Sequence, residues 1–347
     1  MSAEKHITVN PIPIEDPNAA NRKKDHIELA LKSQSNITDN RFYYEPVLSA
    51  HPAAPLQPID FLGKKMLAPI WISSMTGGTE IAGIINKNLA RACAEFGLGM
   101  GLGSTRKLLF SDEYFDDFNL RGIIGNSQPF YANLGIAQVE KLLEEKATDK
   151  IEALVAKLQV DGIFLHINPF QEWLQPEGDI IKRPPLETIQ YLLEIASYKI
   201  IVKEVGQGMG YESLKALFQL PLAAIDFAAH GGTNFSKVEL LRNTSAKQQV
   251  FNNLVNIGHS AEEMVQMSNA ILQELGNKAQ CKEVIISGGI QNFLDGYYLI
   301  NKINTKAVYG QGSAFLQHAR GSYEELQEFV KNQIEGLRLA NAFLKVK

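Results

Sequence analysis

Four side chains with useful chemistry lie within residues 166–172, at the end of a predicted strand. They are His166, Asn168, Gln171 and Glu172. The apolar run 162–165 before them is too short for a buried helix, so it predicts a buried strand that breaks into a loop at Pro169. An imidazole, two amides and a carboxylate can orient a substrate, move a proton or coordinate a cation. Their convergence favours a functional site over a solvated capping loop.

The elements that must position this cluster form a repeating pattern along the chain. Eight short apolar runs predict strands at 66–73, 98–103, 129–134, 161–168, 199–205, 222–228, 283–288 and 306–311. Helical patterns separate or follow most of them, at 81–96, 136–158, 185–197, 211–219, 260–276, 291–303 and 313–345. Strands that alternate with helices pair in parallel through right-handed crossovers, and eight of them fit a closed (β/α)8 TIM barrel. The carboxyl ends of barrel strands face the active site, which places the cluster there.

An open doubly wound sheet is the main alternative fold. It usually carries a GxGxxG fingerprint in its first turn. The glycines of 97–103 alternate strictly instead, a pattern that indicates close backbone approach, for example to a flat ligand. The barrel is therefore expected to occupy residues 66–347, and residues 1–65 to form an N-terminal arm and a cover segment.

The segments outside the regular pattern have their own expected roles. Residues 1–21 are rich in proline and asparagine and predict an extended arm, followed by a helix from Arg22 through about Gln34. Residues 40–65 predict an irregular cover over one end of the barrel. The insertion at 229–259, after the sixth strand, is rich in Asn, Gly and Ser; such long loops are usually lids or disordered segments.

Composition limits the class of protein. The 347 residues are 45% hydrophobic and 21% charged, with a net charge of −4, which is typical of a globular chain and argues against a nucleic-acid-binding protein. Cys93 and Cys281 lie far apart and have no metal-binding spacing, so two buried, reduced thiols are expected. No signal core or membrane-length apolar run occurs, which predicts a cytoplasmic protein without membrane partners.

Polar residues recur at the carboxyl ends of the other predicted strands. In chain order they are Ser73, Ser74, Met75 and Thr76 after strand one, Ser104, Thr105 and Arg106 after strand two, Asn133 in strand three, Lys203 in strand five, and His230 and Thr233 after strand six. Strands seven and eight end in glycine turns, Gly288-Gly289 and Gly312-Ser313. Glycines let backbone N–H groups point at an anion, and barrels commonly bind a phosphate after their last two strands. A phosphate, the alternating glycines and a lysine on strand five together suggest FMN.

The chain resembles the type 2, FMN-dependent isopentenyl-diphosphate delta-isomerases. The resemblance covers residues 21–316 and is carried by seven motifs in the family's order: Asn21-Arg22-Lys23-Lys24-Asp25-His26, Ser74-Met75-Thr76-Gly77-Gly78, Gly103-Ser104-Thr105-Arg106, Ala132-Asn133-Leu134-Gly135, His166-x-Asn168-x-x-Gln171-Glu172, Gly231-Gly232-Thr233 and Ser287-Gly288-Gly289-Ile290. The first and fifth motifs are highly specific. The resemblance implies interconversion of isopentenyl and dimethylallyl diphosphate in isoprenoid biosynthesis, with reduced FMN, Mg²⁺ and NADPH. It also implies a homotetramer or homo-octamer.

The resemblance further implies a role for each site residue. Substrate contacts would come from Arg22, Lys23, Ser104, Thr105, Arg106 and Gln171. The cofactor would be contacted by Ser74, Met75, Thr76, Ser104, Asn133, Lys203, Thr233, Gly288, Gly289, Gly312 and Ser313. Glu172 would bind Mg²⁺, and the catalytic group would comprise Gln171, His166 and Asn168. Because protonation of an unactivated alkene leaves a poorly stabilised cation, the hypothesis is that FMN is the acid–base catalyst and that Gln171 orients or relays.

Two other classes of protein share part of this pattern. FMN-dependent α-hydroxy-acid oxidoreductases use a His-Gly-Gly-Arg stretch after a barrel strand, where the arginine grips the substrate carboxylate. Here His230 matches, but Thr233 replaces the arginine, and the role of His230 stays open. A non-catalytic flavin-binding protein would explain the glycine turns but not the convergence of Arg106 and Glu172.

Overall fold

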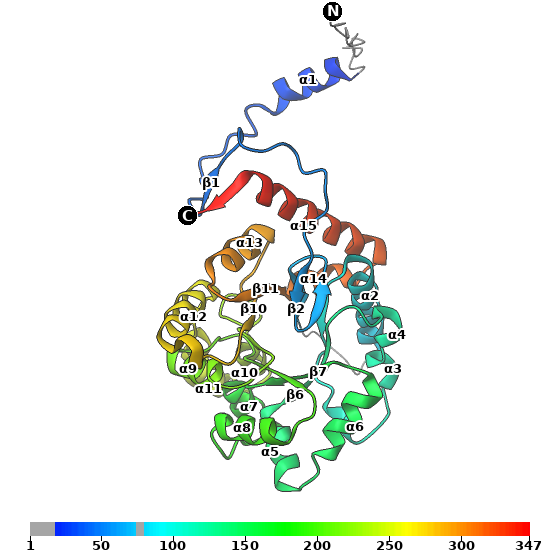
Figure 1. The fold of residues 1–347 in the computed structure, drawn as a ribbon, viewed down its shortest axis with the longest axis vertical. Helices are drawn as coiled ribbons and strands as arrows, with labels where there is room; N and C mark the ends of the chain where they lie inside the picture. Colours follow the sequence, from blue (N-terminus) through cyan, green and yellow to red (C-terminus); the bar gives the residue numbers. More distant parts are fainter. Residues whose placement is uncertain (1–17, 74–79) are drawn as a thin grey trace, which may run out of the picture. The chain divides into compact units, whose positions relative to one another are not determined.

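The computed structural model describes residues 18–73 and 80–347, and the described chain contains a closed barrel of eight parallel strands (Figure 1). In barrel order the strands are β4 (Ile70–Ile72), β5 (Gly99–Gly101), β6 (Phe130–Gly135), β7 (Gly162–His166), β8 (Lys199–Lys203), β9 (Ala224–Asp226), β10 (Glu283–Ser287) and β11 (Lys306–Gln311). Seven of them lie within predicted runs, and β6 extends one residue beyond the run 129–134. β11 pairs with β4 to close the ring. The predicted (β/α)8 barrel is confirmed.

The chain divides into two units, residues 1–42 with Lys347 and residues 43–346. The first unit carries α1 (Ala19–Leu29), which ends before the predicted boundary near Gln34. The second unit contains the barrel. No helix within 18–73 and 80–347 has the length and apolar character to cross a bilayer.

Helices follow most of the barrel strands, as Figure 1 shows. They include α2 (Glu80–Phe96), α8 (Pro185–Ile195), α9 (Tyr211–Phe218), α12 (Ala261–Leu275) and α13 (Phe293–Lys302). The predicted helix 136–158 is instead α5 (Ile136–Glu144) and α6 (Asp149–Leu158), separated where Lys146 takes a left-handed φ of 54°. The predicted helix 313–345 is likewise α14 (Ser313–Ala319) and α15 (Tyr323–Phe343), because the Ser322 side chain caps a new helix start.

The amino end of the barrel is covered by a hairpin of β2 (Ile59–Phe61) and β3 (Lys64–Met66). The segment 40–65 was predicted to be irregular, but β1 (Phe42–Tyr44), which pairs with β12 (Leu344–Val346), and β2 give part of it regular structure. The Leu62 N–H donates to Glu283 Oε2 at 2.6 Å, and its carbonyl accepts from Lys199 Nζ at 2.6 Å. Both partners begin strands, which fixes the hairpin at that end.

An aromatic cluster fills the barrel above the hairpin. Trp71 packs against Phe61, Tyr131 and Phe164 with ring centroids 5.8–6.3 Å apart. A Cβ on Gly99 would lie 2.3 Å from the indole of Trp71. At this position the close approach predicted from the alternating glycines is therefore made by a core side chain rather than by a flat ligand.

Two segments that were predicted as loops contain helices. The loop predicted at Pro169 is α7 (Pro169–Leu174), because proline is favoured in the first turn of a helix, where its missing N–H is not needed. The insertion 229–259 forms α10 (Phe235–Leu241), α11 (Ser245–Phe251) and a 3₁₀ turn at Asn252–Asn256. Leu174, Leu240 and Val255 give α7 and this insertion a small shared core.

Candidate active site

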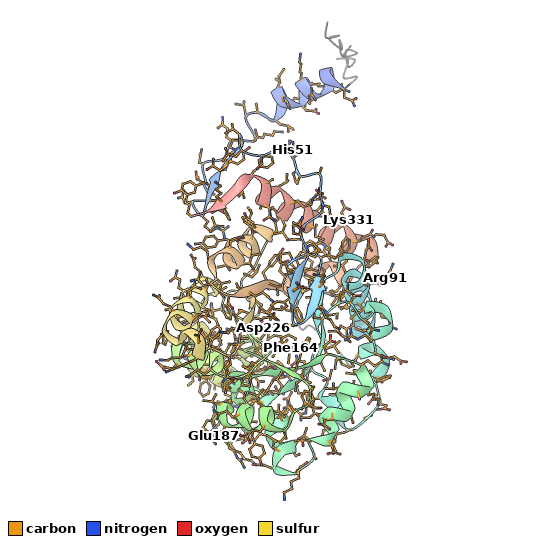
Figure 2. The ribbon with its side chains drawn as sticks, viewed as in Figure 1. His51, Arg91, Phe164, Glu187, Asp226 and Lys331 are labelled. Atoms are coloured by element: carbon orange, nitrogen blue, oxygen red, sulfur yellow. The ribbon has the colours of Figure 1, made fainter. Side chains whose placement is uncertain are left out.

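Strand register gathers a polar layer at the carboxyl end of the barrel. His166 pairs in register with Lys203, and Lys203 pairs with Asp226. Side chains in register on neighbouring parallel strands point to the same face. Phe164, two residues before His166, belongs to the internal cluster, so these three polar side chains also point into the barrel. Figure 2 shows Phe164 and Asp226 within the ring of strands.

His166 is held as a neutral imidazole. Its Nδ1 lies 2.8 Å from Asn133 Oδ1, and Asn133 Nδ2 donates to the Leu102 carbonyl at 3.2 Å. Since that second bond assigns Oδ1 as the acceptor, Nδ1 carries the proton and Nε2 is free to accept one. Burial, and secondarily the charge of Lys203, lowers the pKa of His166 to about 3. Although the ring keeps some solvent exposure, both effects favour the neutral form.

A buried ionic group occupies β8, β9 and β10. Burial lowers the pKa of Lys203, whereas the charges of Asp226 and Glu204 oppose that shift. Burial raises the pKa of Asp226, although Lys203 and the Ser287 hydroxyl, which donates to Asp226 Oδ1, favour its carboxylate. Ser287 Oγ also accepts the Ala228 N–H at 2.9 Å. Sequence reasoning missed Asp226; its signal was a lone carboxylate inside the apolar run 222–228.

The cluster after β7 spreads over α7. Asn168 Nδ2 donates to Gln171 Oε1 at 3.1 Å and to Glu172 Oε1 at 3.0 Å. Glu172 Oε2 accepts the Asp179 N–H at 2.8 Å. The one-turn spacing of a helix thus brings together Asn168, Gln171 and Glu172. Glu172 as a residue is 8% exposed, so unbonded carboxylate oxygens would be costly there.

Arg106 reaches the same cluster through Asp179. Its Nη1 donates to Asp179 Oδ2 at 2.9 Å, and Gln138 Nε2 donates to the same oxygen at 2.9 Å. Arg106 and Glu172 therefore converge, as the sequence predicted, but through an intermediary. Asp179 and Gln138 were not predicted, because neither lies at a strand end.

The glycine turns of β9 and β10 pack against each other. Gly288 and Gly289 have φ values of +88° and +73°, and a Cβ on Gly288 would lie 2.1 Å from the Ala229 carbonyl oxygen. Backbone contact alone thus requires glycine at 288. Thr233, in the facing turn, is exposed. Gly312 immediately precedes α14, which begins at Ser313. Phosphate binding by these turns stays a prediction.

The remaining predicted residues fall into three groups. Thr105 is fully buried, and its hydroxyl donates to the Asn133 carbonyl at 2.9 Å, which joins the ends of β5 and β6; Ser104 beside it is exposed. Arg22 and Lys23 are exposed on α1, in the first unit. The predicted cofactor contacts at Ser74, Met75 and Thr76 lie outside the described residues.

Unpartnered polar atoms at this end of the barrel fit a polar ligand such as FMN. Ser73 Oγ, Gln311 Oε1 and Asn168 Oδ1 are buried and have no hydrogen-bond partner among residues 18–73 and 80–347. Buried polar atoms are normally satisfied, so a bound group with donors and acceptors would complete them. A divalent cation also fits, because Asn168 Oδ1 and the Glu172 carboxylate are oxygen ligands. The described residues contain no group of three or more His, Cys, Asp or Glu side chains able to hold a metal.

Comparisons with solved structures identify the fold class of the chain, and comparisons with curated sequences identify its family. No family model matches the chain. Among solved structures, a flavocytochrome b2 variant with benzoylformate has a TM-score of 0.60 at 16% identity, over 88% of this chain and 76% of that one. A mandelate oxidase variant with a monooxide FMN adduct has a TM-score of 0.56 at 12% identity, over 88% of both chains. The protein therefore shares the α/β barrel of these two proteins.

Sequence relatives identify the family. The isopentenyl-diphosphate delta-isomerase of Rickettsia felis is 33% identical over 325 residues, 92% of this chain and 90% of that protein. The enzyme of Rickettsia prowazekii is 34% identical over 326 residues, with 92% and 91% covered. The chain belongs to the isopentenyl-diphosphate delta-isomerases, which confirms the predicted family.

Proposed function

We propose that this protein interconverts isopentenyl and dimethylallyl diphosphate on reduced FMN bound at the carboxyl end of the barrel. The observation that carries the proposal is the hydrogen-bonded group of Asn168, Gln171, Glu172 and, through Asp179, Arg106, in a chain of the isomerase family. The buried Lys203 pairs in register with His166, at the end of the strand that precedes this group. Reduced FMN, when bound, would supply the acid–base chemistry that an unactivated alkene requires.

The residues of the polar layer would prepare the site for that chemistry. Lys203, buried beside Asp226, would stabilise negative charge on the reduced cofactor. His166, held neutral, would present Nε2 as an acceptor without adding charge. Gln171 would orient the hydrocarbon end of the substrate, or relay a proton to it, from the first turns of α7.

The diphosphate would be bound at the outer edge of the site. Arg106 offers forked donors, and Arg22 and Lys23 of the first unit are proposed to join it on the substrate. Glu172 would bind Mg²⁺, which commonly takes one or two carboxylates together with substrate phosphate oxygens. Gly288, Gly289, Gly312 and Ser313 are proposed to hold the FMN phosphate, and Ser74, Met75, Thr76, Ser104, Asn133 and Thr233 to contact its ring or ribityl chain.

The finer attributes of the protein are part of the same proposal. NADPH is proposed as the reductant of FMN, the assembly as a homotetramer or homo-octamer, and the location as the cytoplasm. The family resemblance supports the reductant and the assembly. The composition and the two buried free cysteines, Cys93 and Cys281, support the cytoplasmic location.

An α-hydroxy-acid oxidoreductase is the second candidate, since its barrel is the same. His230 lies in the position expected for that chemistry, but Thr233 stands where a carboxylate-gripping arginine is needed. The likeness to the oxidases is confined to the fold at 12–16% identity. The isomerase assignment explains Arg106, Gln171 and Glu172 as well.

Anaerobic incubation with isopentenyl diphosphate, FMN, NADPH and Mg²⁺ tests the proposal. We expect dimethylallyl diphosphate to accumulate without stoichiometric NADPH loss, because the reaction involves no net redox change. Bleaching of the bound flavin by lactate, with no isomerisation, would contradict the assignment and favour the oxidoreductase.

A further inference from the structure

Asp179 joins two parts of the proposed site that follow different strands. It belongs to the loop between α7 and α8, and it contacts Arg106 in the 3₁₀ helix after β5, Gln138 from α5 and Glu172 from α7. All three distances are 2.8–2.9 Å. The proposed function uses Arg106 and Glu172 but leaves Asp179 without a role.

The position of Asp179 does not depend on Arg106. Its N–H donates to Glu172 Oε2, and its Oδ2 accepts from Gln138 Nε2. Gly178, immediately before it, allows the loop to lie against α7: a Cβ there would be 1.9 Å from the Glu172 carbonyl oxygen. The carboxylate is therefore a fixed anchor, to which the longer Arg106 side chain attaches.

Stability alone does not account for this ion pair. The side chains of Arg106 and Asp179 are 52% and 41% exposed, and exposed pairs contribute little to folding because water and salt screen them. A carboxylate beside a diphosphate site is also electrostatically unfavourable for the substrate. If Asp179 serves binding, it must contribute a favourable effect larger than that repulsion.

Asp179 can contribute such an effect by holding the Arg106 side chain in one orientation. A half-exposed arginine has many rotamers, and ordering it on binding costs affinity. The contact with Asp179 uses Nη1, and a guanidinium carries five N–H donors in a fixed plane, so donors remain for phosphate oxygens.

We propose that Asp179 is a positioning residue for diphosphate recognition, which holds Arg106 in its binding orientation and ties it to the carboxylate of Glu172. The inference rests on the proposed function. It predicts that Asp179 acts on binding more than on turnover, and that it acts through Arg106.

Titration calorimetry of the FMN-loaded full chain with inorganic pyrophosphate and Mg²⁺ tests this without turnover. We expect Asp179→Asn, which keeps the shape but removes the charge, to raise the Kd about tenfold. The KM for isopentenyl diphosphate should rise similarly, while kcat changes less than threefold. Gln138→Leu, which removes the second donor to Asp179, should give a smaller increase in the same direction. Glu274→Gln, which removes an exposed ion pair with Lys215 elsewhere, should leave the Kd unchanged.

A double-mutant cycle separates positioning from a general structural effect. In an Arg106→Gln background, Asp179→Asn should change the Kd less than twofold, because the group on which it acts is gone. Flavin content and Tm show whether each variant is folded. Tighter pyrophosphate binding by Asp179→Asn would mean that Asp179 competes with the ligand. An equally large loss of pyrophosphate affinity in the Arg106→Gln background would mean a structural role. Either result overturns the proposal. Failure of the wild-type protein both to bind pyrophosphate and to isomerise would instead contradict the proposed function.

Discussion

The buried and partly buried ionic groups at the amino end of the barrel are paired, whereas several buried polar atoms at the carboxyl end have no partner among the described residues. At the amino end, Asp161 bonds to Lys64 at 2.6 Å and to Arg121 at 3.1 Å, and Arg121 also donates to three backbone carbonyls. At the carboxyl end, Ser73 Oγ, Gln311 Oε1 and Asn168 Oδ1 are buried without partners among residues 18–73 and 80–347. The ionic groups of the first end are paired within the chain, although Trp71 Nε1 and the Tyr131 hydroxyl of the aromatic cluster are also buried without a partner among the described residues. The unpartnered atoms of the second end lie beside the proposed site, where a ligand can bond to them.

This difference indicates that the amino end of the barrel contributes mainly to stability and the carboxyl end mainly to function. The amino end joins the hairpin β2–β3 to the barrel through apolar and ionic contacts that are satisfied in the protein itself. The carboxyl end buries Lys203 and Asp226, which costs solvation free energy that a ligand can help to recover. Substitutions at the amino end should therefore change stability, and those at the carboxyl end should change chemistry.

Phe61→Ala should give the largest effect, because Phe61 is fully buried against Trp71 in the aromatic cluster. Loss of a buried phenyl ring costs about 3–5 kcal/mol through transfer and cavity terms. Chemical denaturation should show this loss, while kcat of the folded fraction stays near the wild-type value. Phe110→Ala, at a position 64% exposed, is the matched control and should cost less than about 1 kcal/mol. Equal losses in the two variants would contradict the placement of Phe61 in the buried aromatic cluster.

Gln171→Ala tests the opposite end. We expect kcat for isomerisation to fall about 100-fold, a typical contribution of a positioned proton-transfer group, with the free energy of unfolding changed by less than about 1 kcal/mol. Stopped assays of dimethylallyl diphosphate measure kcat, chemical denaturation measures the free energy of unfolding, and flavin content shows whether FMN is bound. Gln190→Ala, at an exposed position on α8, should leave kcat unchanged. Wild-type turnover in Gln171→Ala with FMN bound would remove Gln171 from the catalytic group.

The fold was predictable because it depends on periodic patterns. The eight apolar runs and their intervening helices determined the barrel, since alternation along the chain implies parallel pairing. The breaks at Lys146 and before Ser322 were missed, because each interrupts an otherwise continuous helical pattern with a local cap or a left-handed residue. Local conformation of this kind is weakly encoded in apolar spacing.

The site was predictable only where it lies at strand ends. His166, Asn168, Gln171 and Glu172 share one short segment, so their proximity followed from the sequence. Asp226 and Gln138 join the site through strand register or through contacts between segments 40 or more residues apart. Asp179 lies seven residues after Glu172, but it reaches Arg106 and Gln138 across 73 and 41 residues. The spacing of residues along the chain does not predict such long-range contacts.

Ser73→Ala should show a smaller effect with opposite signs for stability and binding. Removing a buried hydroxyl that has no partner among residues 18–73 and 80–347 should stabilise the FMN-free protein by about 1 kcal/mol. If FMN bonds to that hydroxyl, its Kd should rise up to about tenfold, because about 1.4 kcal/mol of binding free energy is lost. Ser268→Ala removes a buried hydroxyl on α12 that likewise has no partner in the described part of the chain, and it should stabilise the protein without changing FMN affinity. Identical FMN affinities in the two variants would show that Ser73 does not contact the cofactor.

The pH dependence of stability gives the finest test of the carboxyl end. Burial lowers the pKa of His166 from about 6.5 to about 3, so between these values the unfolded chain binds more protons than the folded protein. The free energy of unfolding should therefore rise with pH through that window and be independent of His166 above it. The slope from this residue has a ceiling of about 1.36 kcal/mol per pH unit, and partial exposure of the ring keeps it below that value. The glutamine of His166→Gln does not titrate, so the free energy of unfolding of this variant should differ less between pH 4.5 and pH 6 than that of the wild-type protein. An unchanged slope in that variant would mean that His166 is protonated in the folded protein, and its proposed neutral acceptor role would be withdrawn.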